Sequence, residues 1–258
     1  MIELILIFIL GLIIGSFLNC VIWRLYKEES FIVGRSYCPH CHHGLGLWDL
    51  FPVLSFVFLR GKCRYCKRKI SLQYPLIELI TAIIFSLVFI YLGSIFSLQL
   101  IFWLIIMAFL IVIFVFDLKY FIIPDEVVYP AIFLSIIWLL YSFFNGMISS
   151  HEIILTIASS LGAALFFFLI WFFSKGMAMG FGDVKLALLI GLLLGFPNTI
   201  VALFLGFLLG AIIGSVAVFL KRKGFGSEVP FAPFLVVGTI ISFFFGNNII
   251  NWYFSLMV

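Results

Sequence analysis

Long apolar runs constrain this chain more than any other feature. Eight such runs, bounded by polar residues or by Gly and Pro, lie at about 2–23, 76–93, 98–116, 126–144, 153–173, 184–196, 199–220 and 234–254. An α-helix needs roughly 20 apolar residues to cross the hydrocarbon core of a bilayer. Only 10% of the residues are charged and the mean hydropathy is +1.32. In soluble domains about a quarter of all residues are charged. The sequence therefore predicts an all-α polytopic membrane protein with about eight transmembrane helices.

The positions of the basic residues predict the orientation of these helices. With the N-terminus outside, four segments face the cytoplasm: 24–75, 117–125, 174–183 and 221–233. All 15 Lys and Arg residues then fall in these segments or at an inner helix end, which is a strong positive-inside signal. Joining the two runs that flank Phe196-Pro197-Asn198 would instead place Lys221, Arg222 and Lys223 outside. We therefore expect eight spans with both termini outside, and we attribute the net charge of +4 to topology, with no nucleic-acid partner.

The polar stretch after the first run predicts a small extramembrane region. The chain begins Met1-Ile2-Glu3, without a basic residue or a small-residue cleavage site before Asn19, so we expect the first helix to remain as an anchor. The expected organisation is an anchor over 1–23, a cytoplasmic loop over 24–75 and a seven-helix membrane core over 76–258.

Four of the five cysteines predict a metal site in this loop. They form two Cys-x-x-Cys pairs, Cys38 with Cys41 and Cys63 with Cys66, separated by 21 residues. Two such pairs suit a tetrahedral zinc site with four cysteine ligands. Four thiolates leave no open coordination position, so the zinc would be structural and would stabilise a loop too small to form its own core. Disulfides or a redox pair are the alternatives, and a reducing cytoplasm opposes disulfides.

Other groups near these cysteines have simpler interpretations. Cys20 lies inside the first apolar run and is expected to act as a small apolar residue. Three histidines beside the first pair could replace a thiolate, but with four cysteines present we expect them either at the surface or around the metal ligands: His40, His42 and His43.

Two of the four aspartates adjoin apolar runs on the same predicted side of the membrane. Asp117 ends the third run, Asp183 precedes the sixth, and two crossings separate them. Ionisable groups at a bilayer boundary are costly and are therefore candidate functional groups. Paired carboxylates in a partly dry site can share a proton and act as acid and base, which predicts aspartic proteolysis. Helix-end caps and a transporter's proton relay are the alternatives.

Glycines occur at two informative places. Gly180 and Gly182 remove side chains beside Asp183, which would permit close approach of a substrate backbone or unusual backbone angles. Three glycines at four-residue spacing in the seventh run predict close helix packing: Gly206, Gly210 and Gly214.

Taken in order, these motifs resemble those of the type IV prepilin peptidases, the bifunctional leader peptidases and N-methyltransferases of bacterial pilus, secretion and competence systems. Gly180-Phe-Gly-Asp183 resembles the GxGD motif of membrane aspartic proteases. Ala232 stands where the family commonly has glycine. Besides the cysteine pairs, the matching segments are Gly15–Arg24, Pro52–Phe56, Leu59–Cys63, Tyr74–Leu79, Asp117–Asp125, Gly180–Lys185 and Pro230–Phe234.

The resemblance implies that Asp117 and Asp183 are the catalytic pair and that the four cysteines hold the metal. Asp125 is either a supporting residue or a turn residue, and Lys185 is either a substrate or carboxylate partner or an interface anchor. The full set of possible supporting residues is Asp125, Lys185, Gly180, Gly182 and Glu78.

The resemblance also implies the substrate and the reaction. A prepilin or pseudopilin with a short basic leader would be cut at the cytoplasmic face of the inner membrane, and the new N-terminus would be methylated from S-adenosylmethionine. Methyl transfer rests on the resemblance alone, because the sequence has no glycine-rich nucleotide-binding signature. The residues that bind the methyl donor and the oligomeric state stay unassigned, and a leader peptidase without methyl transfer is the alternative.

Overall fold

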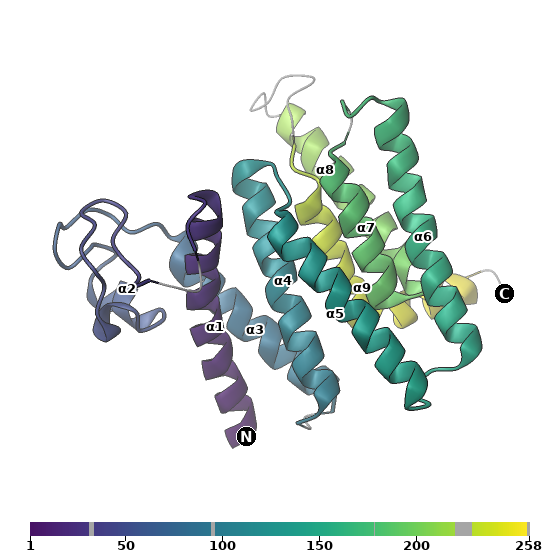
Figure 1. The fold of residues 1–258 in the computed structure, drawn as a ribbon, viewed down its shortest axis with the longest axis horizontal. Helices are drawn as coiled ribbons and strands as arrows, with labels where there is room; N and C mark the ends of the chain where they lie inside the picture. The colour runs from purple at the N-terminus through teal and green to yellow at the C-terminus, as the bar shows by residue number, and fades with distance from the viewer. Residues whose placement is uncertain (31–33, 94–95, 178, 220–228, 257–258) are drawn as a thin grey trace. The chain divides into compact units, whose positions relative to one another are not determined.

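The structure, a computed structural model, is helical in the parts of the chain that it describes, which are residues 1–30, 34–93, 96–177, 179–219 and 229–256 (Figure 1). The predicted inward-facing residues Lys221, Arg222 and Lys223 lie outside these ranges. The long helices are α1 (Ile2–Tyr26), α3 (Gln73–Tyr91), α4 (Leu98–Tyr120), α5 (Asp125–Phe144), α6 (Ser150–Phe173), α7 (Phe181–Leu194), α8 (Asn198–Phe219) and α9 (Ala232–Ser255). Between α1 and α3 lie the short helices η1 (Leu47–Asp49) and α2 (Leu54–Phe58).

Seven of these helices are long and apolar enough to cross a membrane, so the prediction of an all-α polytopic membrane protein is confirmed. The sixth predicted span, α7, is not among these seven helices, because it has only 14 residues, or about 21 Å, against a hydrocarbon core of about 30 Å. It nevertheless runs antiparallel to both α6 and α8 (Figure 1). Helix α7 therefore carries the chain back from one end of α6 toward the other. The predicted break between the sixth and seventh runs is present, because α7 ends at Leu194 and α8 begins at Asn198.

The chain divides into two compact units, Met1–Val112 and Ile113–Val258. In the first unit, α1 and α3 pack antiparallel with their backbones in close contact. A Cβ atom placed on Gly11 would lie 2.5 Å from Ala82 Cα, and one on Gly15 would lie 2.6 Å from Glu78 Cα. Glycine is required at both places because any side chain would push the two helices apart.

The second unit contains the end of α4 and helices α5 to α9. Close approach recurs between α6 and α7, where a Cβ atom on Gly191 would lie 2.2 Å from Ser160 Cα. The Ser160 hydroxyl also donates to the Leu188 carbonyl at 2.8 Å. Small residues and side-chain hydroxyl groups therefore hold the short α7 against α6, as expected where lipid surrounds the helices.

Close helix packing is predicted at three glycines of α8, and the structure shows it at two of them, Gly206 and Gly210, but not at Gly214. Cβ atoms on Gly206 and Gly210 would lie 2.9 Å and 3.2 Å from the side chains of Leu235 and Phe234, so both glycines face α9. Among the described residues, no atom lies within 4 Å of such a Cβ on Gly214. The packing contact has ended by this turn of α8 because the partner helix α9 begins only at Ala232.

The alternating direction of the helices places several helix ends together. The C-terminal end of α4 lies at the same end of the second unit as the N-termini of α5, α7 and α9 (Figure 1). Asp117 is in the last turn of α4, Asp183 is the third residue of α7, and Ala232 is the first residue of α9. This end of the unit therefore gathers the predicted acidic residues.

Candidate active site and metal centre

The structure brings the two predicted aspartates together. Asp117 and Asp183 are both buried, with solvent-exposed fractions of only 6% and 7%. The two carboxyl groups are close enough for a negative charge on Asp117 to interact electrostatically with Asp183. Both are therefore buried carboxylates of a single site, as an acid and base pair requires.

The N-terminus of α9 supplies a partner that the sequence analysis did not identify. The backbone N–H of Ala232 donates to Asp117 Oδ2 at 3.2 Å. The first N–H groups of a helix have no acceptor within the helix, and this end favours negative charge. Because the contact uses the backbone N–H group, alanine can make it as well as glycine. Pro233, a residue type favoured in the first turn of helices, was the sequence signal for this helix start.

The two glycines beside Asp183 differ from each other in their surroundings. A Cβ atom on Gly182 would lie 2.9 Å from Ile123 Cβ, so Gly182 allows α7 to pack against the segment before α5. Gly180 has an extended conformation with φ −75°, and neither glycine adopts a positive φ. The expected unusual backbone angles are therefore absent at these two positions. At Gly180 a Cβ would lie 3.8 Å from Asp183 Oδ2, so only this glycine leaves space beside the carboxylate.

Lys185 and Asp125, two of the candidate supporting residues, bind each other. Lys185 Nζ forms an ion pair with Asp125 Oδ1 at 2.5 Å. The ammonium also lies over the rings of Tyr129 and Phe181, at 4.9 Å and 5.4 Å from their centroids. Half of the Asp125 side chain is exposed, so the pair contributes at most about 1 kcal/mol. Its geometric effect is to join the first turns of α5 and α7 beside Asp183.

The four predicted cysteines also come together, in the first unit. Their sulfur atoms lie within 4.8 Å of one another, and Cys38 Sγ is 3.9 Å from Cys66 Sγ. Four sulfurs around a zinc ion at about 2.3 Å are about 3.8 Å apart. The arrangement therefore fits a tetrahedral zinc ion held by Cys38, Cys41, Cys63 and Cys66, and the cluster does not include Cys20.

The two cysteine pairs are built alike. In each pair the N–H of the first cysteine donates to the carbonyl five residues later, Cys38 to His43 at 3.0 Å and Cys63 to Arg68 at 2.8 Å. The residue after each second cysteine has a positive φ, +55° and +60°: His42 and Lys67. Each pair is thus a complete turn that presents two sulfurs on one side, as a metal site of two such turns requires.

The surroundings of the first pair favour the thiolate at Cys38 but not at Cys41. Burial of Cys38 opposes ionisation, but hydrogen bonds from the backbone of His40 and Cys41 prevail and lower its pKa to about 7. A hydrogen bond from the His43 backbone favours the Cys41 thiolate, but partial desolvation and the thiols of Cys38 and Cys66 prevail and raise the pKa of Cys41 to about 11. The thiolate is the form that binds metals. The neighbouring histidines are exposed, which agrees with a position at the surface: His40, His42 and His43.

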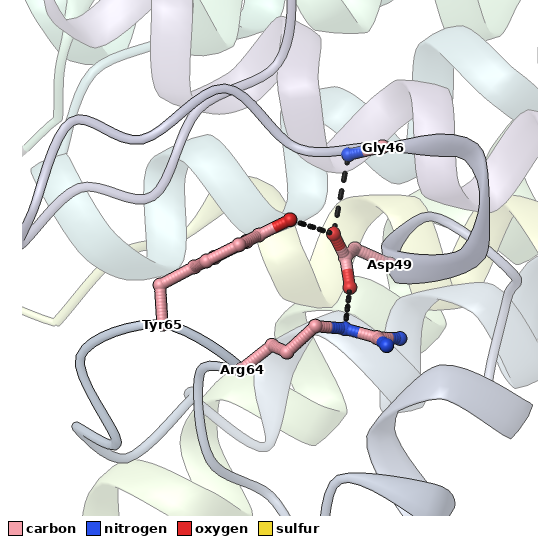
Figure 2. A network of polar contacts seen from close by, with 4 residues as sticks. All are labelled: Gly46, Asp49, Arg64 and Tyr65. Atoms are coloured by element: carbon pink, nitrogen blue, oxygen red, sulfur yellow. Dashed lines mark hydrogen bonds and ion pairs between the residues drawn. The ribbon is translucent and has the colours of Figure 1, made fainter.

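Asp49 connects the second cysteine pair to the segment between the pairs (Figure 2). Its carboxylate accepts from Arg64 Nε at 2.7 Å, from the Gly46 N–H at 3.2 Å and from the Tyr65 hydroxyl at 3.3 Å. Partial burial opposes ionisation, but the hydrogen bonds from Arg64 and Gly46 hold the pKa of Asp49 below its ordinary value. Arg64 and Tyr65 are the two residues between Cys63 and Cys66, so this network orients the second turn.

The remaining candidate, Glu78, lies in the first unit. It is buried, and its carboxylate accepts the Val53 N–H at 2.7 Å. Glu78 therefore attaches the start of α2 to the side of α3, while the other supporting candidates surround the aspartates of the second unit.

Comparison with known proteins also separates the part of the chain that contains the cysteines from the part that contains the aspartates. The model of the bacterial peptidase A24 N-terminal domain matches residues 9–92, which contain the cysteines. The model of the type IV leader peptidase family matches residues 104–215, which contain both aspartates. A prepilin leader peptidase/N-methyltransferase of Bacillus subtilis is 34% identical, with 96% of this chain and 97% of that protein covered. The chain belongs to the type IV leader peptidase family.

Two further relatives of this chain are also named prepilin leader peptidase/N-methyltransferase. One from Legionella pneumophila is 30% identical over 94% of this chain and 91% of its own length. Another from Aeromonas hydrophila is 31% identical over 96% and 92%. No solved structure matches the chain. Both the cysteine cluster and the aspartate pair lie within the matched parts.

Proposed function

We propose that this type IV leader peptidase removes the short basic leader of prepilins or pseudopilins and then methylates the new N-terminus. The observation that carries the proposal is the buried pair Asp117 and Asp183, with the α9 N–H group on one carboxylate. The names of the relatives, which join leader peptidase to N-methyltransferase, support both activities.

In the proposed cleavage, Asp117 and Asp183 share one proton, because two buried carboxylates that feel each other's charge do not readily ionise together. The ionised carboxylate removes a proton from a water molecule, whose oxygen attacks the scissile carbonyl carbon. The protonated carboxyl donates a hydrogen bond to the carbonyl oxygen. When the C–N bond breaks, a proton passes to the departing nitrogen. The products are the carboxylate of the leader and the free N-terminal amine of the mature protein.

We place this reaction at the cytoplasmic face of the inner membrane, with both termini outside. The positive-inside pattern supports this orientation. A substrate whose hydrophobic helix lies in the bilayer would present its leader at the membrane boundary. Asp117 and Asp183 lie at the ends of their apolar helices, which is the depth at which such a cleavage point would be found.

For methyl transfer we propose that residues 24–75 contribute, with a structural zinc ion in the cysteine site. Four thiolates would complete the coordination of zinc, so the ion would hold the two cysteine turns together rather than take part in chemistry. S-adenosylmethionine would supply the methyl group. No residue of this chain is assigned to binding this donor.

The proposed function is tested with purified protein, a synthetic prepilin and isotopically labelled S-adenosylmethionine. We expect the intact mass of the substrate to fall by its leader and the new N-terminal residue to gain one labelled methyl group. A substrate of unchanged mass would contradict the proposal. A cleaved but unmethylated product would support the alternative of a leader peptidase alone.

A further inference from the structure

Helices η1 and α2 expose an apolar surface that nothing among the described residues covers. Trp48 is 77% exposed and Phe58 81% exposed, and Trp48 stacks on Phe51. The surface, here named the loop patch, consists of Leu47, Trp48, Phe51, Leu54, Val57 and Phe58. We propose that the loop patch inserts among the lipids of the leaflet at which α1 ends and α3 begins, with anionic headgroups around it.

Contacts within the first unit give the depth of the loop patch. In the antiparallel pair of α1 and α3, Gly15 lies beside Glu78. One turn further along α1, the Asn19 amide donates to the Tyr74 carbonyl at 3.1 Å. The Glu78 carboxylate holds the N–H of Val53, the residue before α2. Since α1 continues for about 10 Å beyond Asn19, the start of α2 lies beside α1 and below its end, as in Figure 1.

Lipid-facing side chains occur at this depth. Phe17 of α1 and Leu76 of α3 are both exposed, and they lie between the two levels just described. On helices that cross a membrane, exposed apolar side chains at this level face lipid. Leu54 of the loop patch directly follows Val53 and lies at this level, so we expect the patch to meet lipid rather than bulk water.

The charge around the loop patch favours anionic lipid as its partner. Residues 34–72 contain seven basic residues and one acidic residue, a larger excess than the net charge of +4 of the whole chain. Exposed basic residues flank α2 on its C-terminal side, including Arg60 and Lys62. Basic residues near a membrane surface are attracted by anionic headgroups, and aromatic side chains prefer the interface. The basic leader of the proposed substrate carries the same sign of charge and would be repelled.

The apolar and basic groups together form an interfacial element. Such elements bury their apolar face about 5–10 Å into the boundary between headgroups and acyl chains. Insertion here would hold the cysteine turns against the membrane, since Asp49 of η1 binds both residues between Cys63 and Cys66. It would not depend on either proposed activity.

The position of Trp48 can be measured by fluorescence quenching in nanodiscs that contain anionic lipid. The chain has six tryptophans, so the emission of Trp48 is obtained as the difference between the wild type and Trp48→Phe. We expect lipids with brominated acyl chains to quench the larger part of this difference emission and aqueous acrylamide to quench little of it.

Two outcomes would overturn the proposal. Quenching by acrylamide but not by brominated lipid would place the loop patch in water. Protection from both quenchers would mean that protein, such as a second copy of this chain, covers it. A matched pair of variants adds a second test. Phe58→Asp should make Trp48 more accessible to acrylamide, whereas Phe58→Leu should behave as the wild type, and equal behaviour of the two variants would count against insertion.

Discussion

Asp183→Asn and Asp117→Asn are each expected to abolish leader cleavage while methylation of a pre-cleaved pilin continues. The amide can neither accept the proton from water nor donate one to the departing nitrogen. General acid and base catalysis typically contributes about 10²- to 10⁴-fold per group, so we expect the cleavage rate to fall by at least about 100-fold. The rate is measured from the appearance of mature pilin, and methylation from the incorporation of labelled methyl groups.

Glu126→Gln is the matched control for this experiment. Glu126 is an exposed acidic residue in the first turn of α5, next to Asp125 but outside the buried pair. We expect this variant to cleave at the wild-type rate, because only the buried carboxylates take part in the reaction. Cleavage that persisted in either aspartate variant would remove that residue from the mechanism.

Replacement of one cysteine of the proposed metal site is expected to abolish methyl transfer rather than leader cleavage. Cys63→Ser should lower the zinc content of the purified protein and abolish methyl transfer, with a measurable rate of cleavage retained. Structural zinc sites contribute roughly 10 kcal/mol or more of binding free energy in small domains, and a loop of this size has too little core to replace it. Metal analysis and methyl incorporation measure the two effects.

The control for the cysteine variant is Cys20→Ala. Cys20 lies in α1 and does not belong to the sulfur cluster, so its replacement should leave the zinc content and both activities unchanged. Full zinc content in Cys63→Ser would contradict the assignment of this cysteine as a ligand.

Hydropathy predicted the helices well because membrane crossing imposes a strict length and composition. The predicted runs correspond to α1 and to α3 through α9, with ends that differ by a few residues. The shortness of α7 was already apparent in the sequence, since its apolar run covers only 184–196 and the helix, Phe181–Leu194, has 14 residues. The sequence also indicated that the two aspartates would meet, because an even number of crossings returns the chain to the same side.

Contacts between distant segments were not predictable in the same way. The ion pair between Lys185 and Asp125 depends on the relative positions of α5 and α7, and the Ala232 N–H on Asp117 depends on where α9 begins. A backbone donor has no residue-type signal of its own. Gly182 also required the structure, since only the proximity of Ile123 shows that this glycine serves packing.

The proposed function requires two separable sites in one chain, an aspartate pair for cleavage and a cysteine-stabilised loop for methyl transfer. It is tested most directly by giving an uncleaved prepilin and labelled S-adenosylmethionine to Asp183→Asn alone, to Cys63→Ser alone and to both proteins together. We predict no mature product from the first, mature but unmethylated product from the second, and methylated mature product from the mixture. Failure of the mixture to produce methylated pilin, with both proteins folded, would contradict the separation of the two sites.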